Sequence, residues 1–141
     1  MTTIPLGFGD NTYKALGEYA GLSAVVNSFY DIMSSASYAQ KIRAMHPEDI
    51  TLSREKLITF LSGWTGGPRE YSEKFGGISI PGAHAHININ EADKNAWLKC
   101  MDDALIKHQH SEEVRGYLIA QLSRPAQRIV EASAAYQAAH S

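Results

Sequence analysis

Apolar residues recur at helical spacing through most of the chain, and this periodicity limits the fold more than any other feature. One stripe consists of Leu22, Val25, Val26, Phe29, Tyr30 and Met33. A second stripe, between residues 50 and 64, consists of Leu57, Phe60, Leu61 and Trp64. Steps of three and four place each set on one face of a helix, since an α-helix has about 3.6 residues per turn.

Two further helices follow in the second half of the chain. The clearest apolar stripe is Trp97, Cys100, Met101, Ala104 and Leu105. A final segment, from Ser111 to about His140, is predicted to bury Val114, Tyr117, Leu118, Leu122, Ile129 and Val130. We expect Pro125 to kink this last helix, because proline lacks the N–H that a helix uses. The four amphipathic segments together predict an all-α fold.

Composition limits the classes of protein to which the chain can belong. Its 141 residues, of which 44% are hydrophobic and 20% charged, suit one globular domain. A net charge of −2 does not favour nucleic acid as a partner. We also expect no membrane span and no leader segment, because no apolar run is long enough. The single cysteine, Cys100, excludes an internal disulfide and favours a cytoplasmic location.

Residues 69–90 form a weakly periodic stretch between the helical segments. Long connections of this kind in compact domains are often functional. The stretch holds His84 and His86, whose spacing points both side chains to one face of an extended strand. Such a pair can bind zinc, although a zinc site needs further ligands, and Glu91 and Asp93 are the nearest acids. The residues alone leave a zinc site and an ordinary solvated loop both open.

Two aromatic residues with polar tips lie on the apolar stripes. Tyr30 belongs to the first helix and Trp97 begins the stripe of a later one. A buried phenol hydroxyl or indole N–H needs a hydrogen-bond acceptor. Either both side chains bond to backbone carbonyls in the core, or both donors point into a cavity that takes a ligand with negative charge. Cys100, by contrast, lies on an apolar stripe and is expected to be a buried, unreactive side chain.

A series of short motifs resembles one family, the group II truncated haemoglobins. The motifs, in chain order, are Phe29-Tyr30, Pro47-Glu48-Asp49, Phe60-Leu61, Gly66-Gly67-Pro68, Tyr71-Ser72-Glu73, His84 and the run from Ala96 to Met101. Their order and spacing are similar to those of the family over roughly residues 15 to 135. The resemblance implies a two-over-two helical sandwich that holds haem b. It also implies a globin domain at residues 15–141 and a loosely ordered N-terminal arm at residues 1–14.

The resemblance assigns expected roles to individual residues. It implies that His84 is the iron ligand, because Trp97 follows His84, and not His86, by thirteen residues. Tyr30, Trp97 and His46 are the expected catalytic residues on the ligand side of the haem. The full expected haem-binding set is His84, Tyr30, His46, Ser53, Leu57, Phe60, Tyr71 and Trp97. Tyr71, Arg69 and Lys41 are expected near the haem propionates from their charge or polarity and their position along the chain.

The function implied by the resemblance is reversible binding of dioxygen, nitric oxide and carbon monoxide, with slow release of oxygen. Dioxygenation of nitric oxide or reduction of peroxide are the redox uses that this implies. A separate reductase would then supply electrons to a monomer or homodimer. The alternative from a different class is a helical regulatory module without haem, in which His84 and His86 bind zinc.

Overall fold

The computed structural model describes residues 6–71, 74 and 87–140, and its regular elements are all helical. The α-helices are α1 (Asn11–Ala15), α2 (Glu18–Ser35), α3 (Gln40–Ala44), α4 (Thr51–Trp64), α7 (Glu91–Lys107) and α8 (Glu112–Ala139). A short 3-10 helix, η1 (Ser37–Ala39), lies between α2 and α3. The predicted all-α fold is therefore confirmed.

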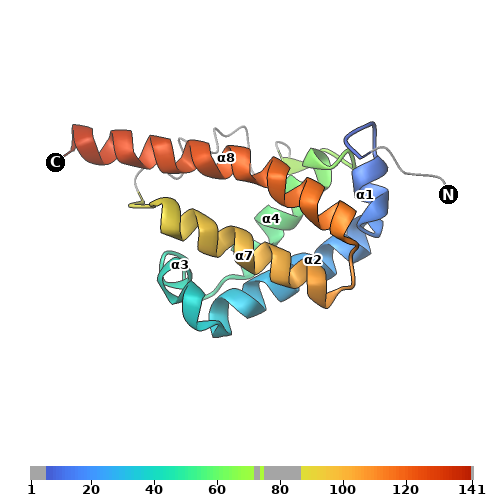
Figure 1. The fold of residues 1–141 in the computed structure, drawn as a ribbon, viewed down its shortest axis with the longest axis horizontal. Helices are drawn as coiled ribbons and strands as arrows, with labels where there is room; N and C mark the ends of the chain where they lie inside the picture. Colours follow the sequence, from blue (N-terminus) through green and yellow to red (C-terminus); the bar gives the residue numbers. More distant parts are fainter. Residues whose placement is uncertain (1–5, 72–73, 75–86, 141) are drawn as a thin grey trace.

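Helix α2 is central because it packs against both α4 and α7. Helix α7 packs on its other side against α8, and Figure 1 shows these two as an antiparallel pair. All six residues of the predicted α2 stripe are buried, and so are Cys100, Met101, Ala104 and Leu105 of α7. The apolar periodicity thus identified the faces that form the core. Trp64 departs from the prediction, because its side chain is 37% exposed at the end of α4.

Helix α8 is the longest element, with 28 residues, and it continues through Pro125. It begins at Ser111, whose side chain accepts a hydrogen bond from the N–H of Val114. Helix α7 begins with a capping box, in which Asn90 and Asp93 each accept a hydrogen bond from the other's backbone N–H. Among the described residues, no helix has both the length and the apolar composition that a bilayer crossing requires.

The N-terminal segment differs from the expected loose arm over its described part, residues 6–14. Residues 11–15 form helix α1, which the sequence patterns did not predict. The N–H of Tyr13 donates to the carbonyl oxygen of Thr65 at 3.1 Å, and the N–H of Gly7 donates to Thr12 Oγ1 at 3.0 Å. The first bond attaches the segment to the end of α4, and the second orders the turn that precedes α1.

The glycines of the Gly66-Gly67-Pro68 motif make room for this attachment. Gly66 has a φ of +98°, a backbone conformation that residues with a side chain rarely adopt. A Cβ atom at Gly66 would also overlap the carbonyl oxygen of Gly9. At Gly67, a Cβ would lie 2.7 Å from the ring of Tyr13. The motif therefore ends α4 and admits the N-terminal segment at the same point.

Replacing Gly66 by alanine is expected to lower the free energy of unfolding by about 2 kcal/mol or more, since the change combines backbone strain with a steric overlap. Gly116 is the matched control, because it lies within α8 and a Cβ there has no atom within 4 Å. Gly116→Ala should instead raise the free energy of unfolding by about 0.5 to 1 kcal/mol. Urea unfolding followed by circular dichroism measures both values. Equal effects of the two substitutions would contradict the steric argument.

Candidate functional site

A cavity of about 320 Å³ lies among the helices, and most of its lining is apolar. Helices α2, α3, α4, α7 and α8 all contribute side chains to it. The other described residues of the wall lie outside these helices, and they are Met45, His46, Tyr71, Ile87 and Ile89. Such a cavity suits a largely apolar ligand, with a few polar groups to orient it.

Seven of the predicted haem-binding residues line this one cavity. They are Tyr30, His46, Ser53, Leu57, Phe60, Tyr71 and Trp97. The eighth, His84, lies outside the described residues, as does His86. The fold therefore brings these seven predicted residues together around one cavity, although they come from positions as far apart as 30 and 97. Their roles toward a bound group remain predictions.

Tyr30 is buried, with 4% of its surface exposed. Its hydroxyl donates to the backbone carbonyl oxygen of Ser53 at 3.3 Å, across the contact between α2 and α4. Burial raises the pKa of Tyr30 to about 12, while the charge of Arg54 acts in the opposite direction. The phenol is therefore protonated at neutral pH, and a ligand in the cavity would compete with Ser53 for its proton.

Trp97 lies on α7 and is half-buried in the cavity wall. Its indole ring packs edge-on against the fully buried Phe29, with the ring centroids 5.0 Å apart. Phe29 packs in the same manner against Tyr30, at 4.9 Å. Both aromatic donors of the cavity are thus fixed against one core residue of α2.

His46 also faces Tyr30, with the two ring centroids 5.8 Å apart. Its Nδ1 lies 2.8 Å from the carbonyl oxygen of Ile42. A carbonyl oxygen only accepts hydrogen bonds, so Nδ1 carries the hydrogen, and Nε2 of a neutral ring carries a lone pair. Donation from Nε2 to a ligand in the cavity therefore requires the positively charged form of His46.

The basic residues at the cavity differ from those expected near propionates. Among the described lining residues, Lys56 and Lys94 are the basic ones. Lys94 Nζ lies 2.7 Å from an oxygen of Glu91 and donates to Gln127 Oε1 at 2.7 Å. Lys41, which was expected near the propionates, pairs at 3.0 Å with the buried Asp93, a residue of the cavity lining.

Lys94 was not among the basic residues that the sequence predicted at this site. Its position three residues before Trp97 was the available signal, because residues three apart share one side of a helix. Lys56 gives the same signal, as it follows Ser53 by three residues. Arg69, the other basic residue expected at this site, is exposed and is not part of the described lining.

Ser133 of α8 fixes the backbone just before α7 and was missed by the sequence analysis. Its side chain is fully buried. Its hydroxyl donates to the carbonyl oxygen of Ile87 at 2.5 Å and accepts from the N–H of Ile89 at 2.9 Å. Both isoleucines line the cavity. One hydroxyl therefore ties this part of the wall to α8.

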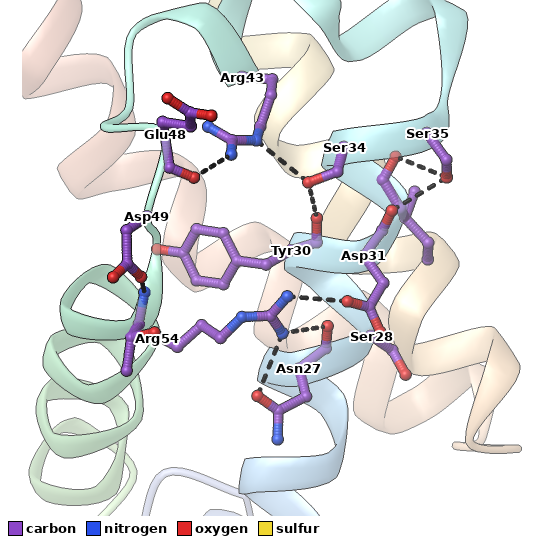
Figure 2. Close-up of polar contacts among 12 residues, drawn as sticks. Asn27, Ser28, Tyr30, Asp31, Ser34, Ser35, Arg43, Glu48, Asp49 and Arg54 are labelled. Atoms are coloured by element: carbon purple, nitrogen blue, oxygen red, sulfur yellow. Dashed lines mark hydrogen bonds and ion pairs between the residues drawn. The ribbon is translucent and has the colours of Figure 1, made fainter.

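Two arginines connect α2 to the segments that follow it (Figure 2). Arg54, in the first turns of α4, donates to the carbonyl oxygen of Asn27 at 2.9 Å and to Asp31 Oδ1 at 2.8 Å. Arg43, in α3, donates to Ser34 Oγ at 3.1 Å and to the carbonyl oxygens of Pro47 and Glu48 at 2.9 and 2.8 Å. The bonds of Arg54 fix the start of α4, which carries Ser53, relative to Tyr30, whereas those of Arg43 attach the segment before α4 to the end of α2.

The comparison with known proteins assigns the family. The family model of the bacterial-like globins matches residues 11–131. A group 2 truncated haemoglobin of Bacillus subtilis is 31% identical over 118 residues, which are 84% of this chain and 86% of that protein. The chain belongs to the group II truncated haemoglobins.

Solved structures of such haemoglobins share the fold. A cold-adapted truncated haemoglobin from Pseudoalteromonas haloplanktis is 31% identical, with a TM-score of 0.79 over 84% of this chain and 96% of that one. A group II 2-on-2 haemoglobin from Agrobacterium tumefaciens is 30% identical, with a TM-score of 0.78 over 84% and 92%. A structure from Bacillus subtilis, described as a truncated oxygen-avid haemoglobin, is 31% identical, with a TM-score of 0.75 over 84% and 98%. The expected two-over-two architecture is confirmed.

Membership in this family implies a haem that binds diatomic ligands, and the residues of the cavity fit such a group. Haem is a flat, mainly apolar ring with two carboxylates on one edge. The cavity offers apolar walls, while Lys56 and Lys94 provide positive charge. Within the described part of the chain, no cluster of three or more His, Cys, Asp or Glu could hold a metal ion. The zinc alternative depends on His84 and His86, which lie outside that part.

Ser133→Ala is expected to lower the free energy of unfolding by about 1 to 3 kcal/mol, because it leaves the N–H of Ile89 and the carbonyl of Ile87 without their partner. Ser123→Ala is the matched control in the same helix, since its hydroxyl donates only to the carbonyl oxygen of Ala120. That change should stay within about 0.5 kcal/mol. Urea unfolding of the haem-loaded protein measures both, and amide exchange at Ile89 should accelerate only in Ser133→Ala. An unchanged exchange rate would rule out the proposed attachment.

Proposed function

We propose that this truncated haemoglobin binds dioxygen at a haem b in the described cavity and releases it slowly. The observation that carries the proposal is the convergence of two hydrogen-bond donors, Tyr30 and Trp97, on one apolar cavity. When bound, a ferrous haem supplies an iron that binds the ligand and places negative charge on it. The protein's own contribution is to hold donors near that charge in a site that excludes most water.

Trp97 is the principal donor in this proposal and Tyr30 the second. The hydroxyl of Tyr30 already has an acceptor in Ser53, so its donation to a ligand requires that bond to break. At 3.3 Å the bond is long, and a charged acceptor is the stronger partner. A hydrogen bond to a charged group contributes about 1.5 to 3 kcal/mol, so the two donors together would slow ligand release by about a hundredfold or more.

Three further residues have roles in the proposal. His84 binds the iron, in keeping with the family resemblance. Lys94 and Lys56 hold the propionates, because they are the lysines that line the described part of the cavity. The description of the Bacillus subtilis protein as oxygen-avid supports slow release here.

Tight oxygen binding suits redox chemistry better than delivery, so we infer dioxygenation of nitric oxide or reduction of peroxide as the use. Either reaction needs electrons from a separate reductase. The proposal includes a monomer or homodimer in the cytoplasm, where Cys100, buried in the core, stays reduced.

Trp97→Phe should raise the oxygen dissociation rate at least about tenfold, because it removes one hydrogen bond to a charged acceptor. Trp64→Phe provides the control, as Trp64 is the other tryptophan of the chain and lies at the exposed end of α4. Stopped-flow displacement of oxygen by carbon monoxide measures the rates. The same rate in Trp97→Phe and in the wild type would remove Trp97 from this role.

His84→Gly should abolish the bond between iron and histidine, and added imidazole should restore the absorption spectrum of the wild type. The reason is that imidazole enters the space that the side chain has left and supplies the same nitrogen ligand. His86→Gly is the matched comparison and should keep the native spectrum without imidazole. If only His86→Gly needs imidazole, the ligand assignment is reversed. A colourless purified protein with stoichiometric zinc would instead favour the haem-free module.

A further inference from the structure

Arg54 is held in one orientation by three acceptors on α2. One of its terminal nitrogens donates to the carbonyl oxygen of Asn27 at 2.9 Å and to Asn27 Oδ1 at 3.2 Å. The other donates to Asp31 Oδ1 at 2.8 Å. The Arg54 side chain is only 25% exposed. A guanidinium bonded through both of its terminal nitrogens has little freedom to rotate. A lysine at this position would be less constrained, because its single ammonium group cannot make the same pair of contacts.

This fixed guanidinium lies beside the ring of Tyr30, as Figure 2 shows. The central carbon of the guanidinium is 5.6 Å from the ring centroid, within the range of a cation–π interaction. Residues 53 and 54 therefore act on Tyr30 from two sides. The carbonyl of Ser53 accepts the phenol hydroxyl, and the side chain of Arg54 covers the ring.

A positive charge at this place alters what the phenol can do. It attracts electron density of the ring and stabilises negative charge on the phenol oxygen. The O–H bond becomes more polar as a result, so the hydroxyl is a stronger hydrogen-bond donor. The contact also limits the movement of the ring, which keeps the donor in place before a ligand arrives.

We propose that Arg54 is a positioning residue for Tyr30, which it holds in place and makes a stronger donor toward a ligand in the cavity. This inference rests on the proposed function, because it assumes that such a ligand binds there. Arg54 itself does not line the cavity and acts only through Tyr30. This role depends on two features of Arg54, which are its hydrogen bonds to Asn27 and Asp31 of α2 and its contact with the ring of Tyr30.

The test compares Arg54→Met with Arg43→Met. Both changes replace an arginine that bridges backbone and side-chain acceptors, but the guanidinium of Arg43 contacts Ser34, Pro47 and Glu48 and not Tyr30. In the ferrous carbon monoxide complex, Arg54→Met should move the infrared band of bound carbon monoxide to higher wavenumber, because the donor next to it weakens. The oxygen dissociation rate should rise about threefold, because weakening one hydrogen bond to a charged group costs less than the tenfold or more expected for losing it. Arg43→Met should leave the band in place.

The same variants show whether Arg54 acts through Tyr30. In a Tyr30→Phe background, adding Arg54→Met should cause no further shift of the band and no further rise in the rate. Protein labelled with ¹³C at tyrosine Cζ gives a separate readout, since Tyr30→Phe identifies the resonance of Tyr30. That resonance should move in Arg54→Met and stay in place in Arg43→Met. An effect of equal size in the Tyr30→Phe background would overturn the proposal.

Arg54→Lys keeps the test decisive if the methionine variant does not fold. Lysine retains the charge but cannot bridge the same acceptors, so a smaller shift of the band in the same direction is expected. No shift in Arg54→Lys would overturn the positioning role. Failure of the proposed function gives a different pattern, in which Tyr30→Phe and Trp97→Phe both leave the band unmoved. If Tyr30→Phe moves the band and Arg54→Met does not, only the inference about Arg54 fails.

Discussion

The contact between α2 and α7 through Phe29 is the constraint on which the arrangement of the cavity depends. Phe29 is fully buried, and its ring meets Tyr30 of its own helix and Trp97 of α7, both edge-on. Because one rigid ring separates the two donors, their relative position follows from the packing of the two helices. The cavity therefore receives its polar groups from the same contact that forms the core. Any change in the spacing of α2 and α7 would therefore change the distance between the two donors.

Hydrogen bonds from side chains to distant backbone groups complete the walls where helix packing alone leaves segments unattached. Ser133 bonds to Ile87 and Ile89, which are more than forty residues away along the chain. Arg54 likewise joins the start of α4 to the backbone of Asn27 in α2, while Arg43 bonds to the nearby carbonyls of Pro47 and Glu48. Each of these contacts provides a hydrogen-bond partner for backbone or buried polar atoms that would otherwise lack one. They fix the irregular segments in place relative to the helices.

The helices and their buried faces could be predicted because periodicity is a local property of the sequence. All six residues of the predicted α2 stripe are buried. Seven predicted haem-binding residues line one cavity, and they could be predicted because the order and spacing of the family motifs identify their positions. The short helices α1 and α3 were missed, since five residues are too few to show a period. Ser133, Arg54 and Lys94 were missed for another reason. Their contacts join segments that are distant in sequence, and a serine, an arginine or a lysine on a helix is usually a solvated side chain.

The bond between His46 and the carbonyl of Ile42 determines how this wall of the cavity responds to acid. The carbonyl keeps the hydrogen on Nδ1 in both charge states of the ring, so an added proton attaches at Nε2. The imidazole then changes from an acceptor to a donor while its plane stays where it is. A single proton thereby inverts the polarity that this position offers to an incoming molecule, and no rotation of the side chain is needed for the reversal.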